Sequence, residues 1–191
     1  MKSTLKLALT LTVWSVIACC ALALVNSFTA PVIEARTNAM ITQALTQIFP
    51  EAKTNENIVS EVNSGNPVVK FDNAYLVKSD KDILGVVITA TGPTYNSSTI
   101  MVGVQTDGTI KTIMFIANDD TKGIGSKVLE PSFTSQFDGK AAASEFKVGS
   151  DVEGVSGATV SSKGVAAILK AVSEAALTYL TDKQILTAEV K

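Results

Sequence analysis

The stretch STIMVGVQTDGTIKTIMFIA, residues 98–117, decides the fold of this chain. Two runs rich in apolar and β-branched residues flank the turn sequence TDG at residues 106–108. Asp-Gly suits turns that require positive φ, so this pattern is a strong signal for a β-hairpin. Two runs of similar character lie upstream, AYLVK (74–78) and ILGVVITAT (83–91). Four successive strands joined by short turns predict an antiparallel sheet.

The N-terminus begins with an uncharged apolar run over residues 7–25. At 1.5 Å per residue the run spans roughly 28 Å, close to the hydrocarbon thickness of a bilayer. Two lysines precede it, so the positive-inside rule places the N-terminus in the cytoplasm and the rest of the chain outside. We therefore expect a single-pass membrane anchor over residues 1–27 and an exported domain over residues 28–191.

Two other interpretations of this run remain open. A cleaved signal peptide would have a shorter apolar region that ends in an Ala-x-Ala-like site, and no clear site is present. The sequence VIAC, which ends at Cys19, resembles a lipobox, but the apolar run continues through ALALV as a membrane span would. We favour an uncleaved anchor over lipidation of Cys19. Since Cys19 and Cys20 both lie in the run, the exported part contains no cysteine and no disulfide.

Helical spacing occurs on both sides of the predicted sheet. Before the sheet, apolar residues recur at steps of three and four from Ile33 to Ile48, with Pro31 at a suitable first helical position. After the sheet, short helical patches are expected around residues 128–137, and a longer helix from about Ser161 to Leu180. The predicted fold class is therefore α+β: an N-terminal transmembrane helix followed by an antiparallel sheet packed by helices.

The composition excludes several classes of function. The chain carries a formal net charge of −2 with no basic patch, so no nucleic-acid partner is expected. It contains no histidine, which removes the common Ser-His-Asp and Cys-His sites and the usual His-ligated metal sites. Asp119 and Asp120 are adjacent carboxylates, a pattern more typical of a solvated turn than of a cation site. We expect no metal site.

The stretch VSGATVSSKG, residues 155–164, places small residues directly before the final helix. Gly157 and Ala158 let the backbone approach a ligand closely. The unpaired amides and dipole of a helix N-terminus favour an anion by about 0.3–1 kcal/mol, so a phosphate would be well placed here. The same residues also serve as ordinary caps in many helices. On the residues alone we favour a plain helix N-terminus over a ligand site.

The sequence SGAT, followed by hydroxyl residues and a helix, resembles the flavinylation motif of the FMN-binding domain family. In that family a flavin transferase attaches FMN through a phosphoester to the threonine of [ST]GAT, which matches Thr159. The loop DDTKGIGSK, residues 119–127, is similar to the ETPGLGSK-like segment of the family. With the anchor that runs into VNSFTAPVIEA and the TDG hairpin, the resemblance covers nearly the whole chain and extends to the G subunit of the Rnf electron transport complex.

Two positions depart from the family pattern. Glu153 stands where the family usually has an aspartate ahead of [ST]GAT, with Asp151 two residues earlier. In the loop, Asp120 and Lys122 stand where glutamate and proline are usual. Neither departure removes the acceptor threonine.

The resemblance implies a covalent FMN on Thr159 and a set of residues around it. Three aromatic residues, Tyr75, Tyr95 and Phe115, are further candidates to pack on the ring, but as predicted strand residues we assign them to the core. The implied cofactor-binding residues come from the two quoted segments: Ser156, Gly157, Ala158, Val160 and Ser161, and Asp120, Thr121, Gly123, Ile124 and Gly125.

The function implied is that of an electron carrier without an active site of its own. It would belong to an Rnf-type complex of a bacterial or archaeal cytoplasmic membrane that couples electron transfer between ferredoxin and NAD to ion translocation. Its flavin domain would lie on the outer side, and its partners would be the other subunits, the membrane and a flavin transferase. Two alternatives are a component like the C subunit of the sodium-translocating NADH:quinone oxidoreductase, which is generally longer, and a non-redox membrane-tethered binding domain.

Overall fold

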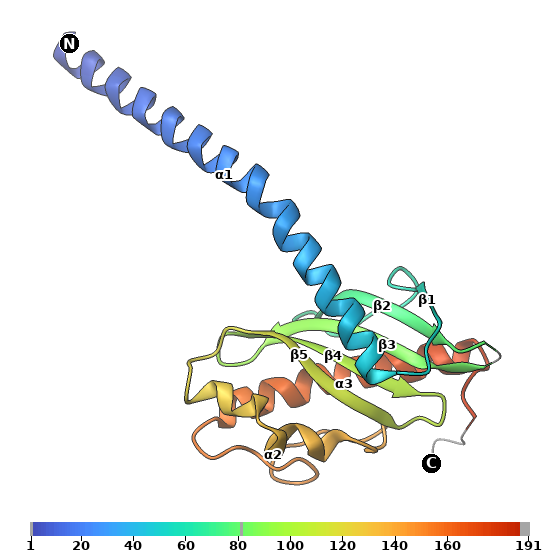
Figure 1. Cartoon of the computed structure of the whole chain (residues 1–191). Helices are drawn as coiled ribbons and strands as arrows, with labels where there is room; N and C mark the ends of the chain where they lie inside the picture. Colours follow the sequence, from blue (N-terminus) through green and yellow to red (C-terminus); the bar gives the residue numbers. More distant parts are fainter. Residues whose placement is uncertain (1, 81, 188–191) are drawn as a thin grey trace. The chain divides into compact units, whose positions relative to one another are not determined.

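The computed structural model describes residues 2–80 and 82–187. By their internal contacts, the residues form two compact units, Met1–Thr42 and Gln43–Lys191. The elements follow the order α1 (Lys2–Ile48), β1 (Thr54–Asn57), β2 (Lys70–Lys78), β3 (Ile83–Pro93), β4 (Ser97–Gln105), β5 (Ile110–Asn118), η1 (Gly125–Leu129), α2 (Pro131–Thr134), η2 (Ser135–Phe137) and α3 (Thr159–Asp182) (Figure 1).

The helix α1 is continuous and contains the apolar span Leu9–Ala30. The large apolar side chains of this span are exposed, as expected for a surface that lipid covers. The helix ends at Ile48, as the pattern predicts, but it continues through Pro31, which is therefore not a first helical position. Membrane helices tolerate an internal proline because neighbouring groups compensate the lost backbone bond. α3 is also long and apolar, but it is largely buried and is a core helix.

The sheet is a fully antiparallel meander of five strands in the order β1-β2-β3-β4-β5 (Figure 1). The four predicted strands are confirmed, although β2 begins at Lys70, four residues before the predicted AYLVK. The additional strand β1 pairs with the end of β2, from Thr54↔Lys78 to Asn57↔Tyr75. Its sequence TNEN is polar and exposed throughout, so it lacks the apolar alternation that identifies a half-buried strand.

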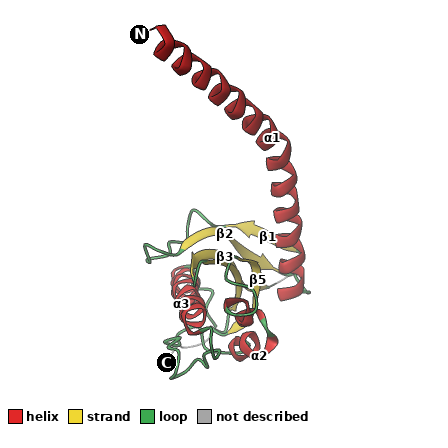
Figure 2. Ribbon diagram, turned by 90° about the vertical axis from the view of Figure 1, so that its left-hand side faces the viewer, coloured by secondary structure: helices red, strands yellow, loops and turns green. Residues whose placement is uncertain are grey.

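Both faces of the sheet are covered. α3 packs against β3 and β4 (Figure 2). Ile88 of β3, Ile100 of β4 and Ile168 of α3 are fully buried. On β4, a Cβ built at Gly103 would lie 2.4 Å from Cγ2 of Ile48, the last residue of α1. The end of α1 therefore packs on the sheet itself. The predicted short helical patches are confirmed as η1, α2 and η2, which bury Phe133 and Phe137.

Candidate functional site

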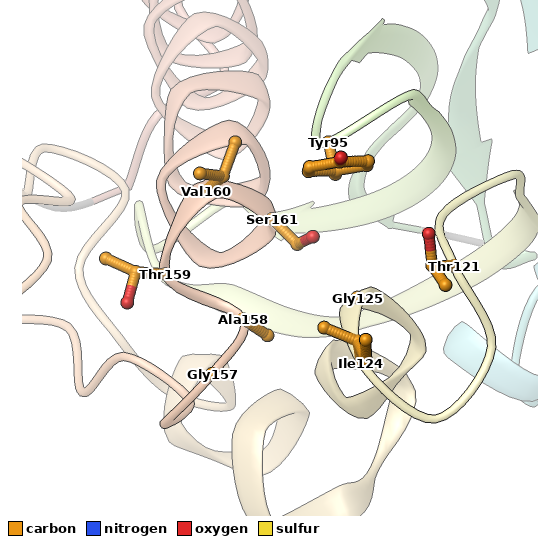
Figure 3. Close-up of a pocket in the computed structure, with 9 residues that line it drawn as sticks. All are labelled: Tyr95, Thr121, Ile124, Gly125, Gly157, Ala158, Thr159, Val160 and Ser161. Carbon is orange, nitrogen blue, oxygen red and sulfur yellow. The ribbon is translucent and has the colours of Figure 1, made fainter.

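A cavity of about 310 Å³ lies where three segments far apart in the sequence meet (Figure 3). The segments are the turn between β3 and β4, the loop between β5 and η1, and the N-terminus of α3. The structure thus brings together eight of the predicted site residues and adds one, Tyr95. The lining residues are Tyr95, Thr121, Ile124, Gly125, Gly157, Ala158, Thr159, Val160 and Ser161.

The helix α3 begins at Thr159, two residues before the predicted start, with Ala158 as its N-cap. Alanine has no polar side chain, so no hydroxyl at the N-cap position accepts from the first amides. The ordinary-cap interpretation of SGAT is therefore wrong for this position. The first turn keeps amides that have no partner within the helix, together with the positive end of its dipole.

The side chains of the first turn point in different directions (Figure 3). The hydroxyl of Ser161 points toward the space between Tyr95, Thr121 and Ile124. The side chain of Thr159 lies on the other side of the turn, away from these residues, and Thr159 is exposed. One helical turn therefore contributes two hydroxyls to the lining of the cavity, that of the exposed Thr159 and that of the buried Ser161.

Asp120 is buried directly behind the cavity wall, whereas Asp119 is exposed. The expectation of a solvated turn is therefore wrong for Asp120. Its Oδ1 accepts hydrogen bonds from the hydroxyl of Thr94 and the amide of Asn96, both at 2.7 Å, while its buried Oδ2 has no partner within the part of the chain that the structure describes. A Cβ at Gly125 would lie 2.6 Å from the Asp120 Cβ and 2.9 Å from the Ser161 Oγ, so only glycine fits between them.

The carboxyl group of Asp120 is held in its ionised form. Burial alone raises the pKa of Asp120, but the Asn96 amide and the neighbouring hydroxyls of Ser161 and Thr94 outweigh it and hold the pKa below its usual value. A fixed negative charge therefore lies directly behind the cavity wall at neutral pH. No cluster of three or more potential metal ligands occurs among the described residues.

We expect Asp120→Asn to reduce the loss of stability in acid. A carboxyl whose pKa is lower in the folded than in the unfolded state contributes stability above about pH 4, and this contribution disappears as the pH falls through the folded-state value. Urea unfolding of the parent chain should therefore show a larger fall in unfolding free energy between about pH 5 and about pH 3 than unfolding of Asp120→Asn. The exposed neighbour provides the control: Asp119→Asn should keep the acid sensitivity of the parent. Equal sensitivity in Asp120→Asn would contradict this role.

Tyr95 is the site residue that the sequence interpretation assigned wrongly. It lies in the turn between β3 and β4, not in a strand, and is 65% exposed at the cavity. Pro93 and Asn96 flank it, and these turn-forming residues were the available signal. Tyr75 and Phe115, by contrast, lie in strands, as predicted, but they are half-buried and not part of the fully buried core.

Three predicted cofactor-binding residues do not line the cavity: Asp120, Gly123 and Ser156. Asp120 lies behind the wall formed by Gly125 and Ser161, as its contacts show. Gly123 and Ser156 are exposed in the two loops that border the site.

The two acidic residues ahead of SGAT have different environments. The carboxylate of Asp151 accepts hydrogen bonds from the amides of Phe146 (3.0 Å) and Lys147 (2.5 Å). Desolvation raises the pKa of Asp151, but these amides hold it below its usual value. The side chain of Glu153 is exposed, and only its backbone is held, by the Gln136 side chain, whose Oε1 accepts from the Glu153 amide at 2.7 Å. Asp151 thus shapes its own loop, while Glu153 is the accessible carboxylate near the SGAT segment.

Comparisons with known proteins identify relatives of this chain. A family model described as the FMN-binding domain matches residues 95–174, which include the cavity segments and most of α3. The chain is 32% identical over 183 residues to the G subunit of the Na⁺-translocating ferredoxin:NAD⁺ oxidoreductase complex of Acetobacterium woodii, with 86% of this chain and 87% of the relative covered. It is 29% identical over 170 residues to the G subunit of an ion-translocating oxidoreductase complex of Methanosarcina acetivorans, with 86% and 89% covered.

A second group of relatives matches over a shorter range. The chain is 36% identical over 107 residues to the C subunit of the Na⁺-translocating NADH-quinone reductase of Vibrio anguillarum, but the match covers only 48% of this chain and 42% of the relative. Among solved structures, NqrC of Shewanella oneidensis is similar, with a TM-score of 0.49 and 24% identity over 59% of this chain and 60% of that one.

Proposed function

This chain belongs to the family of G subunits of ion-translocating oxidoreductase complexes and contains the FMN-binding domain of that family, and on this premise we propose that it carries electrons on an FMN attached to Thr159. The observation that carries the proposal is the first turn of α3. It holds an exposed threonine hydroxyl at Thr159, and its next hydroxyl, that of Ser161, points into the cavity.

The residues of the cavity suit a flavin. The cavity volume of about 310 Å³ is at the lower end of the range for ligand pockets, which fits a planar ring that is partly exposed. Tyr95, Ile124 and Val160 supply apolar surface that is exposed in the structure.

We assign separate parts of the FMN to separate groups of the chain. The free amides and dipole of the first turn of α3 would stabilise the phosphate. The apolar walls would hold the ring, and the Ser161 hydroxyl would meet its polar edge. Bound FMN supplies the redox chemistry, and the protein supplies position, electrostatics and shielding. The ionised Asp120 disfavours additional negative charge in the cavity and so lowers the tendency of this site to accept electrons.

Attachment through Thr159 suits a carrier outside the cytoplasm, where a lost flavin is not readily replaced. A tethered ring returns to its pocket at an effective concentration of about a millimolar or more, so modest noncovalent contacts are sufficient. A flavin transferase is the partner required for attachment. In this proposal the other subunits of the complex supply and remove the electrons, and the overall reaction is that of a ferredoxin:NAD oxidoreductase.

The coverage of the relatives separates the two redox candidates. The chain spans 87% of the G-subunit relative but only 42% of the C-subunit relative, so the second role would leave more than half of that protein without a counterpart. We therefore favour the role of a G subunit.

Intact mass distinguishes the proposed carrier from a non-redox binding domain. The chain produced together with a flavin transferase should exceed its polypeptide mass by one FMN less a water, and its band should fluoresce after denaturing electrophoresis. Production without the transferase is the control and should give the bare polypeptide mass. A bare mass in both preparations would reject the proposal.

We further predict that the flavin domain lies outside the cytoplasm. The lysines that precede the span favour retention of the N-terminus inside, and the span Leu9–Ala30 is long enough to cross the membrane once. A reporter that is active only after export should therefore be active when fused to the C-terminus. The same reporter fused before the span serves as the control and should be inactive. Activity in the opposite pattern would reverse the topology.

A further inference from the structure

Ser162, in the first turn of α3, is fully buried and closes the loop that precedes the helix. Its Oγ accepts a hydrogen bond from the Val155 amide at 3.0 Å and donates one to the Ala158 carbonyl at 3.0 Å. The Ala158 amide in turn donates to the Val155 carbonyl at 2.9 Å. Three hydrogen bonds therefore close residues 155–158 into a compact loop, and two of them use one hydroxyl.

The two ends of this loop, Val155 and Ala158, pack on the core, but its middle has no such support. Ser156 and Gly157 are exposed, and Gly157 adopts φ +80°, a conformation that glycine supplies without rigidity. Segments with few buried apolar contacts open locally at low free energy. Ser156 and Gly157 therefore do little to hold the loop closed, and the two hydrogen bonds of the Ser162 hydroxyl link its ends.

The connection also determines the position of Thr159. Residue 159 follows Ala158 directly, and the Ala158 carbonyl accepts both the Ser162 hydroxyl and the Ser162 amide, the latter at 2.9 Å. If the loop opened, the first turn of α3 would fray, and Thr159 would move relative to Ser161. Thr159, the attachment point, and Ser161, in the cavity wall, therefore keep a fixed relative position only while this loop is closed.

From this geometry we propose that Ser162 is a positioning residue that fixes the flavin attachment point relative to the cavity. The inference rests on the attachment at Thr159 proposed above. Ser162 does not touch the ligand; it acts through the loop and through Thr159. Because Thr159 is held in one position, the attached flavin stays near the cavity and its motion is limited.

Burial of a serine in α3 is not by itself a reason for this role. A helical serine often donates to the carbonyl four residues earlier, as Ser162 does to Ala158. The hydrogen bond accepted from the Val155 amide goes beyond that pattern, because it ties a residue outside the helix. Ser173 lies in the same helix and is equally buried, but its Oγ has no partner among the described residues. Ser173 therefore provides a matched control.

The test compares Ser162→Ala with Ser173→Ala in the full chain, each produced with a flavin transferase. We expect intact mass to show flavin on both. The probe is hydrogen exchange of the Ala158 amide, because this amide donates to the Val155 carbonyl and not to the serine. In Ser162→Ala this exchange should be about fivefold faster, which is the factor expected for the loss of one ordinary hydrogen bond. The fluorescence anisotropy of the attached flavin should also fall toward that of a freely rotating group. Ser173→Ala should match the parent in both measurements.

Two outcomes separate the inference from the function on which it rests. If Ser162→Ala carries flavin and keeps the exchange rate and anisotropy of the parent, Ser162 has no positioning role. If the parent itself carries no flavin, attachment at Thr159 is wrong and the inference is rejected with it. Ser162→Thr keeps the hydroxyl and should retain the flavin anisotropy of the parent. If Ser162→Ala does not fold, Ser162→Cys replaces it in the test: it keeps the side-chain volume with a weaker hydrogen-bonding group, and its flavin anisotropy should be lower than that of the parent.

Discussion

Thr159→Val should carry no covalent flavin at all, while its fold and stability stay close to those of the parent chain. Only a side-chain oxygen can form the phosphoester, and valine keeps the branched shape of threonine without that oxygen. Thr159 is exposed and is not the N-cap of α3, so the substitution removes no cap. Threonine and valine also have similar helix propensities, so the change in unfolding free energy should stay within about 0.5 kcal/mol.

Intact mass and fluorescence after denaturing electrophoresis measure this outcome directly. Thr159→Ser keeps an oxygen at the same position and should retain attachment. Ser161→Ala is a matched control from the same turn, because it removes the hydroxyl that points into the cavity and not the accessible one. Flavin fluorescence that survives denaturation of Thr159→Val would place the attachment elsewhere.

Gly164→Ala should destabilise the domain, although alanine is the better helix former. Replacing a glycine in a helix interior normally stabilises by roughly 0.5–1 kcal/mol. Here an added Cβ would lie 2.5 Å from the Pro93 carbonyl oxygen and 2.6 Å from the Thr94 Cα. Both are backbone atoms and cannot rotate away, so the overpacking cost of about 1–3 kcal/mol, or more, exceeds the gain in propensity.

The displacement caused by Gly164→Ala should also reach the cavity. The turn that the new methyl group pushes carries Tyr95, and the Thr94 hydroxyl is a hydrogen-bond donor to Asp120. We therefore expect a net loss of roughly 0.5–2.5 kcal/mol in urea unfolding, the overpacking cost less the propensity gain, together with weaker hydrogen-exchange protection of the Asn96 amide. Lys163→Ala changes an exposed neighbour in the same turn and should stay within about 0.5 kcal/mol. An unchanged or higher stability for Gly164→Ala would show that the contact relaxes at no cost.

The parts of the fold that the sequence predicts are those with a local physical signature. β4 and β5 were predictable because an Asp-Gly turn separates two alternating apolar runs. The polar strand β1 was not predictable, since its pairing with β2 depends on an available sheet edge and not on its own residues. Tyr95 was misassigned because tyrosine favours strands, and the turn residues on either side of it were given too little weight.

The candidate site divides in the same way. The motif residues on α3 and in the loop before η1 could be named from the resemblance, since they lie in two short segments. The burial of Asp120 could not, because its partners Thr94 and Asn96 lie more than twenty residues away in sequence. The role of Ser162 was also hidden, since a serine near a helix N-terminus suggests a cap. Only the three-dimensional arrangement shows that its hydroxyl closes the preceding loop.

The meander order of the sheet has a consequence for the timing of folding. Each strand pairs only with its neighbours in the sequence, so the sheet is built from local hairpins, which form quickly. The cavity, however, requires α3, which is the last element of the chain and packs back onto β3 and β4. During synthesis, the sheet can therefore assemble before the cavity exists. The cavity is complete only when the C-terminal helix has docked, so a chain interrupted before α3 would have strands but no place to hold a cofactor.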